Sequence, residues 1–458
     1  MRSATLIFLL FLFGNASAQT CSCEKEFLHV KQFMEHNYAG FSDKIKRIGK
    51  KDYEQKAGEL QQLSKTAKEN CLLIISQYLG IFKDNHIQVS AAFDFTRSDS
   101  AYISSRQPVG ISEEKIEALR RSTTTEGIYN FNFDSAYTIA VYEDKTPLRD
   151  YVGVIIDSKL PSWKRGLIKF EAKQVSDNLL KGTLYIRNHM PRVEWFFLGK
   201  NSIGGDWQRE GTKRENIQGA YQPVASRKLS GKTLYIKISS FDPSNYKRID
   251  SVFKANEEAL KSMPYLVLDL RNNGGGSDFS YTPILPYIST GPVKNIGVDV
   301  LATEANIAGW KKLLSDNDIP EASKRSIEAM IGKMEANKGK LVNIADDETD
   351  STYKPLPYPQ KVAVLVNRGC ASTTEQFLLY AMQSSKVILM GENTDGTLDY
   401  SNMRDSSFSC MPYTLHYATT RSRRLDIGQG IDDAGIKPDK FLKPETDWIE
   451  EAVKILEQ

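Results

Sequence analysis

Hydrophobic and polar positions change their spacing along the chain, and these changes divide it into regions. Near the start, apolar residues recur at helical spacing among Lys, Glu and Gln, as in EFLHVKQFMEHNYAGF. This spacing predicts two or three helices over residues 23–83. Residues 100–225 instead hold short β-forming runs such as YTIAVYE and VEWFFLG, separated by Gly, Pro and Asp turns. These runs predict a β-rich module.

From about residue 230, short apolar runs alternate with amphipathic stretches. The runs KTLYIKIS, YLVLDL, KVAVLVN and KVILMGE predict buried strands. The last two flank a predicted helix, Thr373 to Gln383, within the length of a βαβ unit, and such a unit is parallel and right-handed. Residues 305–338 predict a charged helical insertion, which is either a lid or a surface excursion.

The pattern predicts an α/β protein with an N-terminal helical segment and a β-rich middle module. The predicted parts are a signal peptide (1–18), the helical segment (19–99), the β-rich module (100–228), an α/β domain (229–445) with the insertion 305–338, and a C-terminal helix (446–458).

The N-terminus has the three parts of a secretory signal. Arg2 is a positive residue, Leu6 to Phe13 form an apolar run too short to span a bilayer, and Ala16-Ser17-Ala18 form a small-residue cleavage site. We expect cleavage after Ala18 and an exported, periplasmic or extracellular protein without an integral membrane segment.

Composition adds limits to this picture. Among 458 residues, 40% are hydrophobic and 26% charged, as in ordinary globular proteins that bury a core. The net charge of +3 is too small to indicate a nucleic-acid or anionic membrane partner. The metal motif His-Glu-x-x-His and Cys-x-x-Cys pairs do not occur, so no metal or organic cofactor is expected.

Five cysteines allow at most two disulfides in an oxidising compartment. Cys21 or Cys23 can pair with Cys71, and spacing does not decide between them. Cys370 is either a small packed residue or the partner of Cys410.

Two stretches of the α/β domain point to chemistry. In YLVLDLRNNGGGSDFS, an apolar strand from Tyr265 to Leu270 runs into three consecutive glycines. Such glycines indicate positive φ or close approach of main chain to a bound group. The Gly-Lys-Ser/Thr of a phosphate loop is missing. The turn is therefore either a tight connection or a cradle of N–H groups for an oxyanion.

The second stretch, VNRGCASTTEQF, places Ser372 before a predicted helix and Glu375 three residues later. This spacing is a capping box, which explains both residues without any chemistry. Ser372 also follows a strand and lies at the positive end of the helix dipole, where an oxyanion would be stabilised. The residues of this stretch alone do not decide whether Ser372 is a helix cap or a nucleophile.

The stretches LVLDLRNNGGG, VLVNRGCASTTEQF, VILMGENTDGT and GIKPDKF together resemble the tail-specific, or C-terminal-processing, serine peptidases, over about residues 230–445. The resemblance implies a crotonase/ClpP-like core and peptide or protein substrates. It implies that Ser372 is the nucleophile, and that Thr373 and the Gly274–Gly276 turn, with Gly275 as the expected donor, form the oxyanion hole. The family's peptide-binding module corresponds to residues 140–210, where we find no convincing carboxylate-binding loop.

The sequence departs from this family at the general base. Most members use a lysine where this chain has Thr397, and no lysine lies between Lys386 and Lys437. The family's other branch, similar to the tricorn core, uses a histidine from an N-terminal segment. His86 in FKDNHIQVS matches that histidine.

By the same resemblance, Asn85 and Asp432 would orient His86. A serine hydroxyl needs such a base near neutral pH, and imidazole titrates in the right range. Among five histidines, His416 in YTLHYATT is the rival because it lies in the same domain as Ser372. The prediction is an exported serine peptidase, with two alternatives: a ligand- or peptide-binding protein on the same fold, and a hydrolase of non-peptide acyl compounds.

Overall fold

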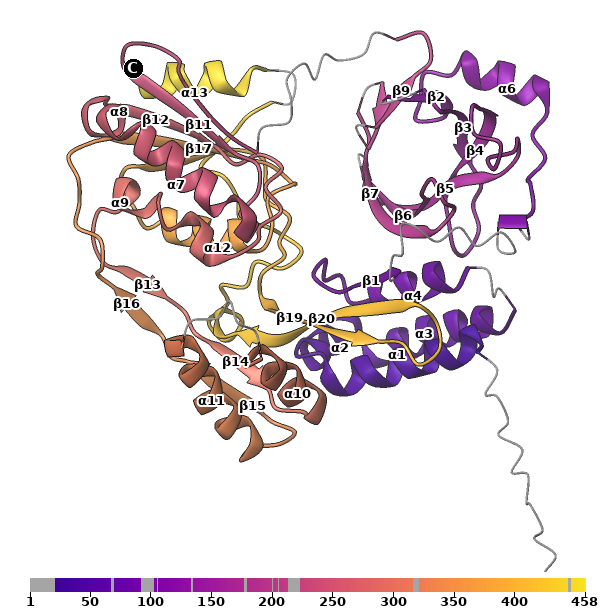
Figure 1. Ribbon diagram of the computed structural model, residues 1–458, viewed down its shortest axis with the longest axis horizontal. Coiled ribbons are helices and arrows are strands. Elements are labelled where there is room, and N and C mark those ends of the chain that lie inside the picture. Colours follow the sequence, from indigo (N-terminus) through magenta and orange to yellow (C-terminus); the bar gives the residue numbers. More distant parts are fainter. Residues whose placement is uncertain are drawn as a thin grey trace, which may run out of the picture.

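The computed structural model describes residues 21–66, 70–91, 103–104, 106–132, 135–176, 179–199, 201–204, 206–212, 223–315, 321–443 and 446–458. The expected signal peptide lies outside these residues. Figure 1 shows N-terminal helices, a β-rich middle module and a core of mixed sheet, which together make a mixed α/β fold. Within the described ranges, no helix is both long and apolar enough to cross a membrane.

Within its described residues, the N-terminal segment contains four helices rather than the two or three expected. They are α1 (Cys23–Asn37), α2 (Phe41–Ile48), α3 (Lys50–Thr66) and α4 (Cys71–Gly80), and strand β1 (Gln88–Ala91) follows. The extra helix arises at Gly49, whose φ of 92° ends α2 so that α3 begins one residue later. The helices share an apolar core that includes Phe27, Tyr78 and Phe82.

Two disulfides join this segment to itself and to the α/β domain. Cys23 pairs with Cys71, and Cys21 pairs with Cys410 in the turn between β19 (Tyr400–Ser407) and β20 (Tyr413–Ser422). Cys370 is a buried free thiol, so the alternative that it bridges Cys410 is wrong.

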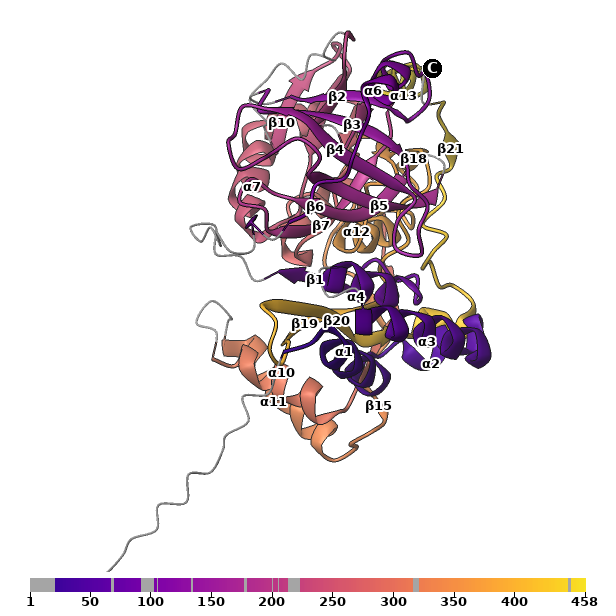
Figure 2. The ribbon, with the colours of Figure 1, turned by 90° about the vertical axis from the view of Figure 1, so that its right-hand side faces the viewer.

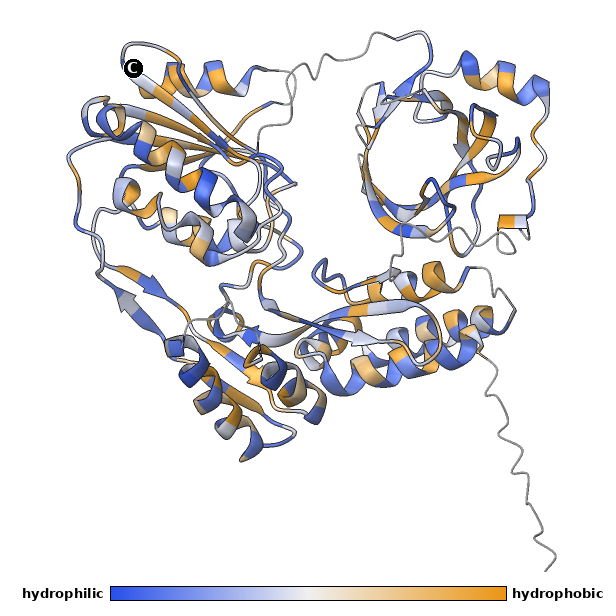
Figure 3. Ribbon diagram, in the orientation of Figure 1, coloured by the Kyte–Doolittle hydropathy of each residue, from blue (hydrophilic) through white to orange (hydrophobic). Residues whose placement is uncertain are grey.

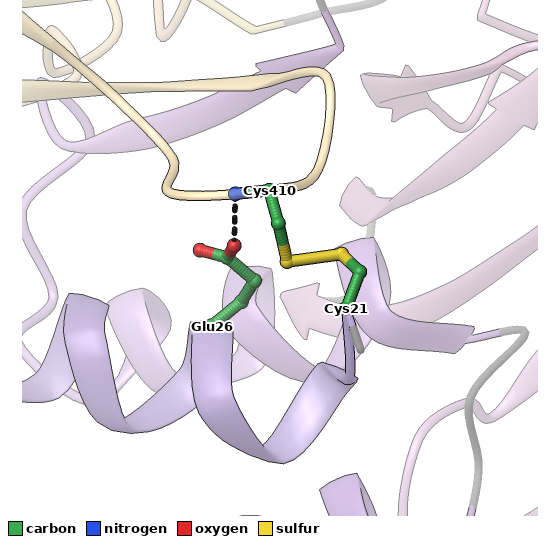
Figure 4. A group of neighbouring side chains, drawn as sticks. All are labelled: Cys21, Glu26 and Cys410. Atoms are coloured by element: carbon green, nitrogen blue, oxygen red, sulfur yellow. Dashed lines mark hydrogen bonds between the residues drawn. A yellow bond between two sulfur atoms is a disulfide. The ribbon is translucent and has the colours of Figure 1, made fainter. Parts of the chain in front are cut away.

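Figure 4 shows Glu26 beside the Cys21–Cys410 bridge. Its carboxylate accepts a hydrogen bond from the Cys410 N–H at 2.5 Å. Because both sulfurs form the disulfide, this trio of potential metal ligands does not make a metal site.

The middle module is one antiparallel sheet that curls into a ring in Figure 1, flanked by α6 (Glu113–Arg120). Its strands are β2 (Gly127–Phe131), β3 (Tyr137–Glu143), β4 (Tyr151–Ser158), β5 (Ile168–Ser176), β6 (Leu179–Tyr185), β7 (Pro191–Phe197), β8 (Ser202–Ile203) and β9 (Trp207–Arg209). The order is β7-β6-β5-β4-β3-β2-β9-β8, and a bridge between Leu198 and Ile203 joins its two ends. Alternate side chains such as Phe170, Phe196 and Trp207 fill the interior.

The α/β domain is built on a six-stranded sheet in the order β10-β11-β12-β17-β18-β21. Its strands are β10 (Val224–Lys228), β11 (Thr233–Ile238), β12 (Tyr265–Asp269), β17 (Lys361–Val366), β18 (Val387–Gly391) and β21 (Lys440–Phe441). Only β10 runs antiparallel to its neighbour, and β17 and β18 pair in parallel around α12 (Thr373–Ala381), as expected. Helices cover both faces, which explains the continuous apolar runs of the central strands.

The helices of this domain divide between the two faces. The helical elements are η2 (Pro243–Asn245), α7 (Tyr246–Ala255), α8 (Glu257–Ser262), η3 (Asp278–Tyr281), α9 (Leu285–Ile288), η4 (Arg423–Ile427) and α13 (Trp448–Leu456). In Figure 1, α7, α9 and α12 lie on one side of the sheet and the C-terminal α13 on the other.

A second sheet connects the N-terminal segment to the α/β domain. Its order is β1-β20-β14-β15, and β19 also pairs with β20. The elements of this region are β13 (Val293–Asn295), β14 (Val298–Leu301), α10 (Glu304–Leu313), α11 (Glu321–Glu335), β15 (Leu341–Ala345) and β16 (Glu348–Asp350). Strand β1 pairs antiparallel with β20, with Gln88 opposite His416. This pairing carries His86, two residues before β1, toward the domain that holds Ser372.

Candidate active site

Ser372 lies at the N-terminus of α12 in a backbone conformation that non-glycine residues rarely adopt. Its φ is 55° and its ψ is −123°. Neighbouring groups hold this conformation: the Ser372 N–H lies 3.0 Å from the carbonyl oxygen of Thr397 and 3.3 Å from a carboxylate oxygen of Glu375. The Glu375 contact is one half of the expected capping box.

The Ser372 hydroxyl lies beside the ring of His86. The distance from Ser372 Oγ to His86 Nε2 is 2.9 Å, and from His86 Nδ1 to the backbone oxygen of Tyr400 is 2.6 Å. A carbonyl oxygen can only accept, so Nδ1 must carry the ring proton. Nε2 is then an acceptor facing the serine O–H, which is the tautomer a general base requires.

Asn85 lies next to His86 in sequence but its side chain differs from the expectation. Its amide donates to Asp395 at 2.9 Å. Both ring nitrogens of His86 already have the partners Ser372 and Tyr400. Asn85 therefore fastens the segment before His86 to the loop of Asp395, and does not orient the ring directly.

Asp432 also acts at a distance from the ring. One carboxylate oxygen accepts from the Asp399 N–H at 2.8 Å, and the other lies 3.1 Å from Lys44 Nζ. Both side chains of this ion pair are nearly inaccessible, at 2% and 5% exposure. Burial and the nearby Asp84 raise the pKa of Asp432, while Lys44 opposes that rise.

These two contacts connect Asp432 to the two backbone segments next to His86. Asp399 directly precedes Tyr400, whose carbonyl accepts from the ring. Lys44 also donates to the backbone oxygen of Lys83, three residues before His86. Asp432 is thus linked to the surroundings of His86 through these backbone segments, and the ring nitrogens have other partners.

The structure adds positioning groups that the sequence did not indicate. The Asp84 carboxylate accepts from the backbone N–H of His86 at 2.9 Å and from the Tyr38 hydroxyl at 2.6 Å. Tyr400 contacts the ring through its backbone carbonyl. A backbone group has no side-chain signature, whereas Asp84 in KDNH could have been suspected as the residue that fixes the turn.

Thr397, at the place of the family's lysine, is buried. Its hydroxyl donates to Asp395 and its N–H to Glu375, at 2.7 Å for the latter. Glu375 is itself fully buried, and burial raises its pKa to about 7 against the effect of its hydrogen bonds. Threonine here closes a network behind Ser372 and provides no base.

The glycine turn packs against the tip of α12. A side chain at Gly275, whose φ is +103°, would come within 2.9 Å of both Ser372 Cβ and the Thr373 nitrogen. The Gly275 N–H, however, donates to Asn273 Oδ1 at 3.1 Å and is not free. Gly276 and Thr373 line the cavity in front of Ser372, and within the described ranges their N–H groups have no hydrogen-bond acceptor.

This arrangement corrects one expectation. Gly275 provides room for the close approach of the turn to the helix, and Gly276 replaces it as the candidate donor beside Thr373. Gly274 is exposed and lies outside the lining of the cavity.

Ser372 and His86 open into a cavity of about 1300 Å³. The walls include the glycine turn, η3 and the start of β19. Residues at the cavity surface include Asp278, Phe279, Tyr281, Tyr353, Leu398 and Arg404. The volume is sufficient for several residues of an extended peptide.

The rival histidine lies elsewhere. His416 Nε2 is 2.7 Å from Ser90 Oγ, and its Nδ1 is 2.6 Å from Asp405. His416 therefore does not contact Ser372, whose hydroxyl is hydrogen-bonded to His86. Burial raises the pKa of Cys370 to about 12, so this thiol is a neutral packed group.

Comparisons with known proteins show what the chain is similar to. Residues 232–440 match the model of peptidase family S41, a family of serine hydrolases. A comparison with curated proteins finds no match.

Solved structures resemble the chain over nearly its whole length. Mature CPAF complexed with lactacystin is 12% identical, with 95% of this chain and 97% of that chain covered and a TM-score of 0.50, which shows a shared fold. A putative peptidase from Parabacteroides merdae is 14% identical over 95% of this chain and 97% of that chain, with a TM-score of 0.45. The tricorn protease is 15% identical over 95% of this chain and 37% of that chain, with a TM-score of 0.43.

Proposed function

We propose that the chain is an exported serine peptidase on a crotonase/ClpP-like core, with Ser372 as nucleophile and His86 as general base. The observation that carries the proposal is the 2.9 Å contact between Ser372 Oγ and His86 Nε2, across 286 positions of sequence, with Nδ1 fixed by a carbonyl. A serine hydroxyl paired with a base of defined tautomer is an activated nucleophile.

The reaction follows from these positions. His86 Nε2 takes the hydroxyl proton as Ser372 Oγ bonds to the scissile carbonyl carbon. The Thr373 and Gly276 N–H groups, with the positive end of α12, stabilise the oxyanion. His86 then gives its proton to the leaving amine as the C–N bond breaks. Water hydrolyses the acyl-serine ester by the same steps in reverse order.

Other parts of the chain support the remaining predictions. The two disulfides are typical of oxidising compartments and support export. The helical segment 19–99 supplies the base, the module 100–228 is the barrel, and the domain 229–445 supplies the nucleophile and the oxyanion donors. We retain these boundaries as predictions.

A fluorophosphonate probe tests the proposal, because it labels only activated serines. We expect one adduct, located on Ser372 by peptide mass spectrometry, and no adduct in the Ser372→Ala or His86→Ala protein. Ser90→Ala is the matched control and should label normally. If the folded wild-type protein is not labelled, the result would instead support the alternative of a ligand- or peptide-binding protein. If the probe labels Ser372 and the protein hydrolyses ester substrates but no peptide substrates, the result would support a non-peptide acyl hydrolase.

A further inference from the structure

A second cavity, of about 620 Å³, lies where all three regions of the chain meet. Its walls come from α3 and α4, from β5 to β7 of the barrel, and from loops of the α/β domain. Figure 2 shows α4 directly beside the barrel strands β5 to β7, and α4 also contacts β6 and β7. This cavity shares no lining residue with the cavity of Ser372. Its volume is in the usual range for small-molecule sites.

The uncompensated charge at this cavity is positive. Four cationic residues of its lining make no ion pair within the described ranges: Lys56, Lys83, Lys181 and Arg368. The fifth, Lys173, pairs with Asp150 at 3.0 Å.

The three carboxylates of the lining are already engaged. Asp84 accepts from Tyr38 and from the His86 N–H, and Asp395 accepts from Asn85. Asp433 pairs with Arg47 at 2.5 Å. The lining thus holds five cationic side chains against three carboxylates, so an anion entering the cavity would meet a net positive charge.

Lys181 is the most confined of these cations. It projects from β6, and its Nζ lies 4.6 Å from the centre of the Trp195 ring. Burial lowers the pKa of Lys181 to about 8, although Asp84 and Asp395 act in the opposite direction. The lowered pKa means that the charged form lacks sufficient stabilisation, which a bound anion would supply.

The same cavity has an apolar wall. Val175 on β5 and Phe197 on β7, the two strands that flank β6, are 54% and 46% exposed there, high fractions for large hydrophobic side chains. Trp195 and Leu179 extend this wall beside Lys181. An apolar body would cover these side chains while its charged end remained near Lys181.

We propose that this cavity binds a small amphipathic organic anion, with its acidic group beside Lys181 and its apolar body against Trp195 and Phe197. The inference needs no hydrolytic activity, so it stands or falls independently of the proposed peptidase function. Binding can therefore be measured on the Ser372→Ala protein.

Isothermal titration calorimetry with sodium decanoate is the test, in the full-length protein with both disulfides intact. We expect one site, and about tenfold weaker binding in Lys181→Gln, the usual consequence of losing one charge-assisted hydrogen bond. Trp195→Ala should also weaken binding. Lys51→Gln is the matched control: Lys51 lies on α3 with Lys56, is exposed, and does not line the cavity. Its affinity should equal that of the parent.

Three further results would overturn the proposal besides the absence of binding. Equal binding of decanol would mean an apolar surface without anion recognition. Equal binding of inorganic phosphate would mean an anion site in which the apolar wall has no part. Unchanged affinity in Lys181→Gln, with unfolding like that of the parent, would place the anion elsewhere. Lys181 is partly buried and makes no ion pair within the described ranges, so removing its charge should not itself unfold the protein, and the variant is expected to be measurable.

Discussion

Two serine–histidine pairs in this molecule have nearly the same geometry but different surroundings. Ser372 and His86 are 2.9 Å apart, and Ser90 and His416 are 2.7 Å apart. The second pair even has a carboxylate, Asp405, at 2.6 Å from the other ring nitrogen, whereas His86 has only a backbone carbonyl. By its hydrogen bonds alone, the cluster of Ser90, His416 and Asp405 resembles a catalytic triad more closely.

The difference lies in what surrounds each hydroxyl. Ser372 stands in a strained conformation at the positive end of a helix, beside a glycine turn and a large cavity. Ser90 lies in strand β1, whose residues pair with β20, and it lines neither of the two cavities described above. A triad of hydrogen bonds is thus insufficient without donors for the oxyanion and room for the substrate. The His416 cluster instead links β1 to β19 across β20, the strand that pairs with both.

The largest expected effect separates the two pairs by activity. Ser372→Ala and His86→Ala should each lower peptide hydrolysis about 10⁴-fold or more, because the nucleophile and its base act as one unit. Ser90→Ala and His416→Ala should retain activity, measured as kcat/KM with a common peptide substrate. Activity that survives in His86→Ala and disappears in His416→Ala would reverse the assignment.

A second contrast compares Asp432, near the Ser372–His86 pair, with Asp405, which contacts His416 of the second pair. Asp432→Asn leaves the buried Lys44 without its partner and should lower the free energy of unfolding by about 3–5 kcal/mol. Asp405→Asn removes a carboxylate that is 64% exposed and should cost at most about 1 kcal/mol. Urea denaturation measures both. A double variant, Lys44→Met with Asp432→Leu, should recover part of the first loss, and its failure to do so would contradict the ion-pair explanation.

The third contrast uses the turn that both sites share. The Cys21–Cys410 bridge fastens the N-terminal segment to the turn between β19 and β20, and these strands carry Tyr400 as well as His416. Replacing both cysteines by serine should lower the free energy of unfolding by about 2–5 kcal/mol, as disulfide removal usually does. Cys370→Ala is the control, since this thiol forms no bridge. Equal stability of the disulfide variant and the parent would mean that pairing of β1 with β20 is enough to join the regions.

A smaller effect concerns pH. The pKa of Glu375 behind Ser372 is raised from 4.5 to about 7, so the native state retains a proton there that the unfolded state releases. Its contribution to stability is complete below pH 4.5 and is lost as pH rises through 7. The stability of the parent relative to Glu375→Gln, followed by chemical denaturation across this range, should therefore decline and then level. If the difference in the free energy of unfolding between the parent and Glu375→Gln instead rises with pH, the charged form of Glu375 stabilises the native state.

The order of regions and the main elements could be predicted because they depend on local patterns. The strand at Tyr137–Glu143 matches the run YTIAVYE residue for residue. The helix α12 begins at Thr373 as the capping pattern indicates. The closure of the middle strands into a barrel was not predictable, since the contact of Leu198 with Ile203 depends on the twist of the whole sheet.

At the site, the sequence alone determined the chemistry that was available: a serine at a helix start, a glycine turn, and a histidine in place of a missing lysine. Tertiary structure decided which groups meet. It placed His86 rather than His416 at Ser372, gave the Nδ1 contact to the Tyr400 carbonyl, and replaced Gly275 by Gly276 as the candidate donor. The reason is physical: residue type and local spacing determine what a side chain can do, but strand pairing across hundreds of residues determines what it touches.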